Sequence, residues 1–299
     1  MRGPAVSTGS SGSEVGTGRY VTWLACGLLA AAIVAVGSAL DGLLGTGPAL
    51  TLLGLALALA YLIGTFGPTM PFFGRVASTR AEPDQFALTF DDGPDPRNTP
   101  EISRLLAVRG HRATFFVLGA HARRYPNVLA QVLSDGHELA NHGDDHRLLA
   151  FSLPSTLRRQ LSATEEAVRA ATGHAPVRLL RTPHGVRSPW LSLTVGRCGY
   201  RVCGWTGRVF DTAEPGTLRI VERTCRHLAP GSILLLHDAD GSGGGRSRQQ
   251  TVEALPSILD EAERRGLHSV WLSSLVEPFP GLTYGSGRRR RRVRKLGRV

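Results

Sequence analysis

The sequence predicts an α/β fold, a distorted (β/α) barrel of about seven strands, preceded by a two-helix transmembrane hairpin. Two observations predict the barrel. Short apolar runs alternate with segments of helical periodicity, and polar residues recur where the apolar runs end. Two long uncharged stretches near the N-terminus predict the hairpin.

Composition divides the 299 residues into five parts. Residues 1–18 are rich in Gly, Ser and Thr and are expected to be a disordered leader. Residues 19–67 hold the uncharged stretches, and residues 68–84 are a Pro-punctuated linker. Residues 85–278 form the predicted α/β domain, and residues 279–299 are a basic tail.

The two uncharged stretches, residues 21–40 and 50–66, approach the roughly 20 helical residues that cross about 30 Å of hydrocarbon. A cleavable signal peptide is one open alternative, although its apolar run is usually only about 7 to 15 residues long. A single span followed by a buried or interfacial helix is another. Basic residues flank the pair and none lies in its turn, which predicts cytoplasmic flanks. We expect a multi-pass cell-membrane protein whose α/β domain faces the cytoplasm, an extracytoplasmic domain being the alternative.

The basic charge of the chain lies mostly in its tail. Of a net charge of +11, eight positive charges lie within residues 288–298. No nucleic-acid partner is therefore expected. Near an anionic leaflet each basic residue gains about 1 kcal/mol, so we expect the membrane and its anionic lipid headgroups as partners. A solvated tail without a partner remains the alternative.

The four cysteines, Cys26, Cys198, Cys203 and Cys225, have no CxxC spacing. This argues against a zinc finger or a redox motif. The three cysteines outside the apolar stretches cannot all pair within one chain, which favours a reducing compartment, although one disulfide and one free thiol would fit outside the cell.

Seven apolar runs in the α/β domain predict strands. They cover residues 85–90, 113–119, 137–142, 177–184, 200–206, 232–238 and 268–274. Residues 100–109, 127–134, 154–172 and 250–265 have helical periodicity. Alternating strands and helices indicate parallel pairing, and repeated polar residues at strand ends favour a small barrel over an open sheet.

Carboxylates and imidazoles follow the first and third of these runs. Asp91 and Asp92 come directly after an apolar strand, although an Asp-Asp-Gly-Pro segment is by itself an ordinary turn. His142 and His146 are four residues apart, as in known zinc sites. One carboxylate and two neutral imidazoles leave positions open for water and substrate, as a catalytic divalent metal requires.

The other carboxylate could then act as the general base on a metal-bound water. Arg181 could hold that carboxylate ionised by charge pairing, and His237 could protonate a leaving nitrogen. Two further histidines, His111 and His121, are expected at the surface.

Five motifs stand in order along residues 85–276. They are TFDDGP at 89–94, GHELANHGDDH at 136–146, RTPHG at 181–185, GWTGRVFDT at 204–212 and ILLLHD at 233–238. In these motifs the chain resembles the polysaccharide deacetylase family, the family 4 carbohydrate esterases built on the NodB homology domain. The resemblance implies a metal-dependent hydrolase.

The resemblance implies a role for each matching residue. Asp91 would be the catalytic base, oriented and charge-paired by Arg181. Asp92, His142 and His146 would bind the divalent metal, with Zn²⁺ the expected ion.

Five further positions complete the implied site. His237 would be the general acid, supported by Asp211. Trp205 and Leu235 would form the walls of the pocket for the acyl methyl, and the backbone N–H of His184 would stabilise the oxyanion.

Three departures from the family pattern bear on these assignments. Gly143 stands where the family usually has Ser or Thr, which puts the metal affinity in doubt, and His184 stands where Tyr is common. Asp211 lies in a looser version of the fourth motif, which puts its own role in doubt.

The expected function is removal of N-acetyl (acyl) groups from amino sugars of a polysaccharide or a lipid-linked glycan. Hydrolysis of an amide needs a proton delivered to nitrogen, and the presence of His237 with an Asp partner favours this reaction. Two alternatives stay open: an O-acetyl esterase acting on polysaccharide and a non-catalytic glycan- or lipid-binding protein. The expected substrate is an N-acetylated glycan or glycolipid.

Overall fold

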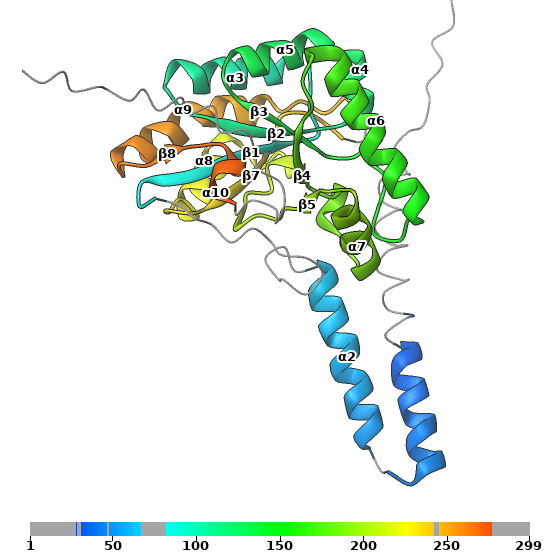
Figure 1. The fold of residues 1–299 in the computed structure, drawn as a ribbon. Coiled ribbons are helices and arrows are strands. Elements are labelled where there is room, and N and C mark those ends of the chain that lie inside the picture. The colour runs from blue at the N-terminus through cyan, green and yellow to red at the C-terminus, as the bar shows by residue number, and fades with distance from the viewer. Residues whose placement is uncertain (1–27, 29–30, 47, 67–81, 242–244, 277–299) are drawn as a thin grey trace, which may run out of the picture.

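The computed structural model describes residues 28, 31–46, 48–66, 82–241 and 245–276, and its centre is one curled sheet (Figure 1). Its eight strands are β1 (Gln85–Asp91), β2 (Ala113–Val117), β3 (Glu138–Asn141), β4 (Val177–Leu180), β5 (Arg201–Val202), β6 (Gly207–Arg208), β7 (Ile233–His237) and β8 (His268–Ser269). Their order is β5-β4-β3-β2-β1-β7-β6, with β8 also beside β1. Every pairing is parallel. The predicted parallel α/β organisation is therefore observed.

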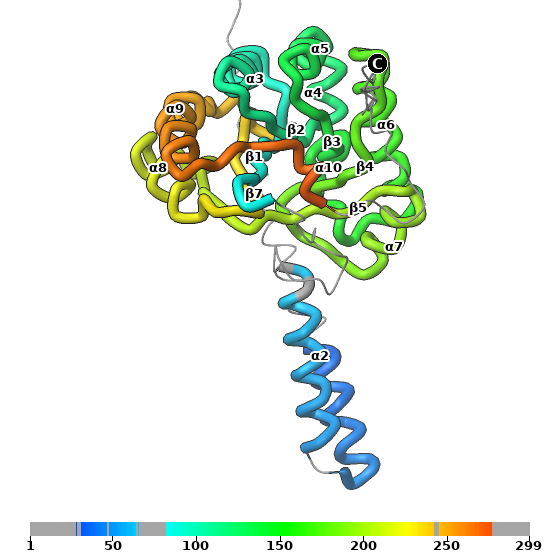
Figure 2. Tube along the Cα trace, turned by 60° about the vertical axis from the view of Figure 1, so that its left-hand side comes forward, coloured from blue at the N-terminus to red at the C-terminus, as the bar shows by residue number. Residues whose placement is uncertain are grey.

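The helices connect these strands and lie around the sheet (Figures 1 and 2). They are α3 (Asn98–Val108), α4 (Gly119–Arg124), α5 (Pro126–Ser134), α6 (Pro154–Thr172), α7 (Pro189–Arg197), α8 (Thr217–Arg226), α9 (Gln249–Arg264) and α10 (Leu272–Leu275). Two short 3₁₀ helices cover Pro183–Gly185 and Asp211–Ala213.

Alternate residues of the central strands face opposite sides of the sheet. In β1, Phe86, Leu88 and Phe90 belong to the core formed with α3, α5 and α9. Ala87 belongs to a second cluster with Trp205 and Leu235. Because side chains alternate along a strand, Thr89 and Asp91 lie on the same side as Ala87. This inner side of the curled sheet carries the polar residues discussed below.

The two edges of the sheet are joined by a single short segment. The Cys203 N–H donates to the Leu180 carbonyl at 2.7 Å, and the Thr206 N–H donates to the Ile233 carbonyl at 2.8 Å. In the described part of the chain, β5 and β6 lie at opposite ends of the strand order and do not pair with each other. The fold is thus a curled sheet whose edges residues 203–206 connect, rather than a barrel closed by strand pairing.

The seven predicted strand segments each contain a strand, and the predicted helix over residues 154–172 coincides with α6. The other predicted helical segments, residues 100–109, 127–134 and 250–265, overlap α3, α5 and α9, whereas α4, α7, α8 and α10 were not predicted. β6 was not predicted either, because the chain crosses from one sheet edge to the other within a few residues of β5.

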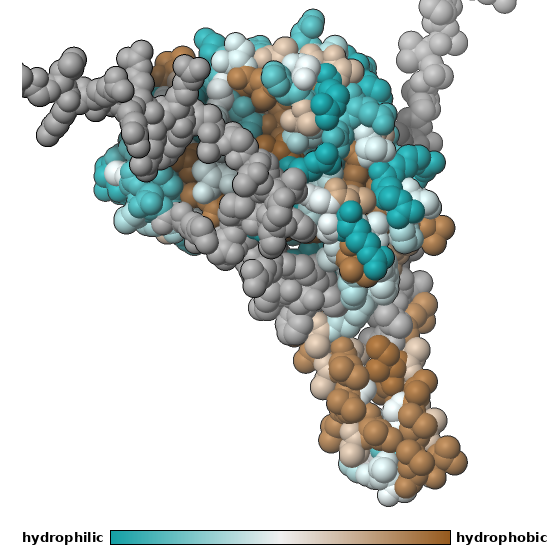
Figure 3. Space-filling model, in the orientation of Figure 1, coloured by the Kyte–Doolittle hydropathy of each residue, from teal (hydrophilic) through white to brown (hydrophobic). Residues whose placement is uncertain are grey.

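The N-terminal segment forms two helices, residues 31–44 and α2 (Ala49–Phe66), which lie side by side and project from the domain (Figures 1 and 2). Gly37 and Gly54 allow this close packing. A Cβ on Gly37 would lie 2.7 Å from the Leu50 carbonyl oxygen, and a Cβ on Gly54 would lie 3.1 Å from the Ile33 carbonyl oxygen. In the turn, the Asp41 carboxylate accepts the N–H groups of Leu50 and Thr51 at 3.0 and 2.8 Å. The exposed surface of the pair is largely apolar (Figure 3).

The membrane prediction is wrong for this helix pair. Among the residues that the structure describes, no helix combines the length and the apolar character needed to span a bilayer. The 18 residues of α2 rise about 27 Å, and the described turns of residues 31–44 rise less, against roughly 30 Å of hydrocarbon. This finding contradicts the predicted transmembrane hairpin and the predicted multi-pass localisation. The predicted leader and the basic tail lie outside the described residues.

Candidate active site

The candidate site lies at the carboxyl ends of the parallel strands. Asp91 is the last residue of β1 and pairs in register with His237, the last residue of β7. His142 and Arg181 directly follow β3 and β4. In parallel sheets these strand ends meet at one edge, which is why residues far apart in the sequence come together here.

Asp91 is buried and forms an ion pair with Arg181. The Arg181 Nη1 donates to Asp91 Oδ1 at 2.8 Å and to Thr89 Oγ1 at 2.8 Å, while Nη2 donates to the Gly204 carbonyl at 2.9 Å. Only 1% of the Arg181 side chain is exposed, and its guanidinium lies 4.2 Å from the centre of the Phe116 ring. Burial of an arginine requires such partners, so this ion pair fixes the orientation of the Asp91 carboxylate.

Asp92, His142 and His146 form a compact set of three possible metal ligands. Asp92 Oδ1 lies 3.2 Å from His142 Nε2 and 3.1 Å from His146 Nε2. One ligand atom of each residue lies within 4.8 Å of the other two. Burial raises the pKa of Asp92, but the nearby imidazoles outweigh this and hold that pKa well below its usual value.

The local hydrogen bonds fit a metal at this position. His142 Nδ1 is 2.8 Å from the Arg181 carbonyl, which accepts a hydrogen bond from Nδ1–H and leaves Nε2 for a ligand. Asp92 Oδ1 is buried and accepts no well-oriented hydrogen bond from any described residue. A buried oxygen without a donor, aimed between two imidazole nitrogens, suits Zn²⁺ or a similar divalent ion.

Gly143 and Asn141 fix the loop between the two histidines. Gly143 has φ +85°, a conformation that favours glycine, and its N–H donates to Asn141 Oδ1 at 2.8 Å. This contact ties the loop to β3 without the hydroxyl that the family usually has there.

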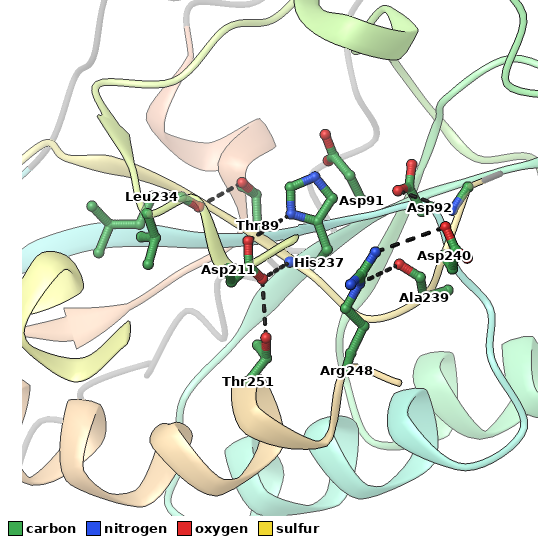
Figure 4. Close-up of polar contacts among 12 residues, drawn as sticks. Thr89, Asp91, Asp92, Asp211, Leu234, His237, Ala239, Asp240, Arg248 and Thr251 are labelled. Atoms are coloured by element: carbon green, nitrogen blue, oxygen red, sulfur yellow. Dashed lines mark hydrogen bonds and ion pairs between the residues drawn. The ribbon is translucent and has the colours of Figure 1, made fainter. Parts of the chain in front are cut away.

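His237 and Asp211 form the second buried pair. His237 Nδ1 lies 2.8 Å from Asp211 Oδ1, and the His237 N–H donates to Asp211 Oδ2 at 2.8 Å (Figure 4). Thr251 Oγ1 donates to the same Oδ2 at 3.0 Å. Burial lowers the pKa of His237, but the charge and hydrogen bond of Asp211 outweigh it and raise that pKa to about 9. His237 is thus protonated at neutral pH.

Trp205 and Leu235 belong to one buried cluster beside Arg181. Their exposed fractions are 6% and 3%, and Trp205 lies 5.8 Å from the Arg181 guanidinium. Gly185 approaches Trp205 so closely that a Cβ would lie 2.5 Å from the indole. The structure thereby brings the loop of residues 183–185 against this cluster.

His184 is exposed and has φ +62°, which is unusual for a residue other than glycine. Its ring lies 4.6 Å from that of His146 in an edge-to-face arrangement. The predicted substrate-binding residue therefore lies beside a candidate metal ligand.

Several contacts of the site were not predicted from the sequence. Thr89 is two residues before Asp91, so strand alternation could have placed it there. Thr251 comes from α9 and has no such signal. His121 is half-buried rather than at the surface, and its Nδ1 lies 2.8 Å from the Asp92 carbonyl. His111 is fully buried, between Ser269 and Glu263, so its predicted surface position is wrong.

Comparison with known proteins gives a consistent set of relatives. The family model described as polysaccharide deacetylase matches residues 78–203. A chitooligosaccharide deacetylase of a Bradyrhizobium species is 33% identical over 216 residues, covering 70% of this chain and 94% of that protein. A peptidoglycan-N-acetylglucosamine deacetylase of Bacillus cereus is 35% identical over a match that covers 64% of this chain and 87% of that protein. The solved structure of a peptidoglycan N-acetylglucosamine deacetylase matches with a TM-score of 0.63 at 29% identity. The match covers 67% of this chain and 92% of that chain.

Proposed function

The chain belongs to the polysaccharide deacetylase family and is a polysaccharide N-deacetylase, and from this premise we propose its reaction. We propose that it hydrolyses the acetamide of N-acetylglucosamine units in a glycan of the chitooligosaccharide or peptidoglycan type. One observation carries this proposal: the Asp91–Arg181 pair, the Asp92–His142–His146 set and the His237–Asp211 pair meet at one edge of the sheet.

Asp92, His142 and His146 would hold a divalent ion, for which zinc is the best match to the donor set. Such an ion, when bound, polarises the acetamide carbonyl and lowers the pKa of water. His142 is held for this role by the Arg181 carbonyl, and Asp92 by the Gly241 N–H at 3.1 Å.

Asp91 would accept the proton of the attacking water. Its carboxylate is the acceptor in the buried ion pair with Arg181, which fixes the orientation that a general base needs. Attack of the water oxygen on the amide carbon then forms the C–O bond and places negative charge on the carbonyl oxygen. The backbone N–H of His184 would stabilise that oxygen.

His237 would deliver a proton to the amide nitrogen as the C–N bond breaks. Its imidazolium is stabilised by Asp211, and Figure 4 shows its ring beside Asp91. Acetate and the free amine of the sugar are the products. Trp205 and Leu235 would receive the acetyl methyl, because both are apolar and belong to the buried cluster beside Arg181.

The O-acetyl esterase remains the second candidate because the same residues could cleave an ester. The paired imidazolium of His237 favours the amide, since an amine leaves only when its nitrogen is protonated. The non-catalytic alternative would bind glycan without releasing acetate.

The test is product analysis with purified protein. We expect acetate and free amines from a chitooligosaccharide, and a larger rate on that substrate than on O-acetylated xylan. Asp91→Asn is the matched control, because it keeps the size of the side chain and removes the base. Equal acetate release by Asp91→Asn, or release from xylan alone, would contradict the proposal.

A further inference from the structure

A cavity of about 350 Å³ lies beside the candidate active site, and none of its lining residues has a part in the proposed reaction. It is formed by the turn after β1, the carboxyl end of α4 and the segment that leads into α9. Its volume lies at the lower end of the roughly 300 to 1,000 Å³ usual for ligand pockets. It is therefore large enough for a substituent of a sugar.

The cavity shares a wall with the candidate metal ligands. His121 lines it, and His121 Nδ1 is 2.8 Å from the backbone carbonyl of Asp92. Asp240 also lines it, and the next residue, Gly241, donates its N–H to Asp92 Oδ2 at 3.1 Å. Figure 4 shows Asp240 on the same side of the site as Asp92. A glycan bound at the metal ligands would thus pass next to the cavity.

Three arginines give this cavity its charge. Arg97, Arg124 and Arg246 all line it and are exposed. Across the part of the chain that the structure describes, none of these guanidinium groups forms an ion pair. Arg124 is instead held against the ring of Tyr125, 5.2 Å from its centre. Arginine presents a planar set of donors that matches carboxylate and phosphate oxygens.

The two carboxylates that line the cavity are already engaged by the protein. Asp95 Oδ1 accepts the N–H groups of Arg97 and Asn98 at 2.9 and 2.8 Å at the start of α3. Asp240 Oδ2 accepts the N–H of Arg246 at 3.1 Å, and its Oδ1 lies 3.8 Å from Arg248. The arginine side chains are therefore the groups that a ligand would meet.

We infer that this cavity binds an oxyanion, a carboxylate or a phosphate, on a sugar next to the one that is deacetylated. The inference rests on the proposed function and gives the substrate a chemical class: an acidic amino-sugar glycan. A neutral chitooligosaccharide would occupy the active site without using the arginines.

Binding to matched oligosaccharides tests the inference without relying on turnover. The acidic probe is a peptidoglycan glycan oligomer, in which alternate sugars carry a lactyl carboxylate, and the neutral probe is the same oligomer with those carboxylates converted to methyl amides. For the full chain we expect the acidic probe to bind roughly tenfold tighter or more, as hydrogen bonds to charged groups imply. We also expect added salt to reduce that preference.

The variant that decides is Arg124→Gln combined with Arg246→Gln. Both side chains are exposed, so the fold does not depend on them, and we expect the preference for the acidic probe to fall close to one. Arg219→Gln on α8 is the matched control, because Arg219 is exposed and lies outside the cavity lining. It should leave the preference unchanged.

A second pair of probes separates the two oxyanions. N,N′-diacetylchitobiose 1-phosphate, whose phosphate is on the sugar next to the terminal acetylated one, is compared with N,N′-diacetylchitobiose in the same titration. A preference for either anion that disappears in the double variant supports the inference and identifies the group. The inference would be overturned if the wild-type chain preferred neither anionic probe over its neutral counterpart. It would also be overturned if the double variant kept the wild-type preference. Acetate release from a chitooligosaccharide is scored separately, so failure of the proposed function stays distinguishable.

Discussion

At the scale of single residues, the candidate site holds a carboxylate and an imidazole, each in its own buried pair. Asp91 is paired with Arg181, and His237 is paired with Asp211, whose charge and hydrogen bond raise the pKa of His237. A base and an acid that act at one pH need such different surroundings. Two predictions test this division of roles.

The first concerns the leaving group. His237→Ala should lower hydrolysis of an N-acetyl sugar by ~10² to 10⁴-fold, because the amide nitrogen then loses its proton donor. An activated aryl acetate should be affected much less, since its leaving group is a weaker base. The ratio of the two rates is the measurement. Equal losses on both substrates would remove His237 as the leaving-group acid.

The second concerns pH. Asp211 outweighs burial and raises the pKa of His237 to about 9, so the acid form persists across neutral pH and is lost as pH rises through about 9. Asp211→Asn removes the charge that raises this pKa. The basic limb of the kcat/KM profile should therefore move to lower pH, with a smaller loss at the optimum than for His237→Ala. Thr251→Val, which removes one hydrogen bond to Asp211, should move the limb less. An unmoved limb in Asp211→Asn would contradict the pairing.

At the scale of elements, the site depends on loops that follow parallel strands. The loop after β4 shows how tightly they are packed. Gly185 has φ +72° and lies against Trp205, with no room for a Cβ. A side chain here would push the loop of residues 183–185 or the indole out of place.

Gly185→Ala tests this packing against a matched control, Gly173→Ala at the end of α6. Gly173 has φ +75°, but a Cβ there would meet nothing within 4 Å. Both variants should lose about 1 kcal/mol of unfolding free energy, because both force alanine into the left-handed region, and Gly185→Ala should lose more because its Cβ also clashes with Trp205. Only Gly185→Ala should raise KM and change kcat as well. Identical kinetics in the two variants would show that the loop position does not matter for substrate.

At the scale of the whole molecule, the candidate ligands come from two separate segments of the chain. Asp92 follows β1, whereas His142 and His146 follow β3. An ion that binds all three side chains binds the folded chain only, so it should stabilise the fold by mass action.

Metal removal tests this linkage. Prolonged chelation should abolish deacetylation and lower Tm, and added Zn²⁺ should restore both. His142→Ala should have a low Tm that Zn²⁺ does not raise, whereas Asp91→Asn should keep the Zn²⁺ response and lose turnover. Elemental analysis gives the bound metal in each variant. Full activity in chelated protein without detectable metal would contradict the assignment.

Local patterning by itself determined the order of most elements and the chemical types at the site. Hydrophobic periodicity located all the strands except β6 and the helices α3, α5, α6 and α9, because burial imposes a period of two or about 3.6 on the sequence. The motifs around Asp91, His142, Arg181 and His237 were readable because each of these residues ends a strand or directly follows one. Periodicity could not reveal His121 or Thr251, since neither lies in an apolar pattern that points to the site.

Only the tertiary structure decided which of these residues meet and what the N-terminal helices are. Parallel pairing brings Asp91 and His237 into register although 146 positions separate them, and the pairing of β6 with β7 adds Asp211, which follows β6. An uncharged run of residues does not state where its helix begins and ends, and among the described residues no helix is both long and apolar enough to span a membrane. The arginine cavity likewise has no sequence signature, because its three arginines come from two loops and the end of α4, which only folding brings together.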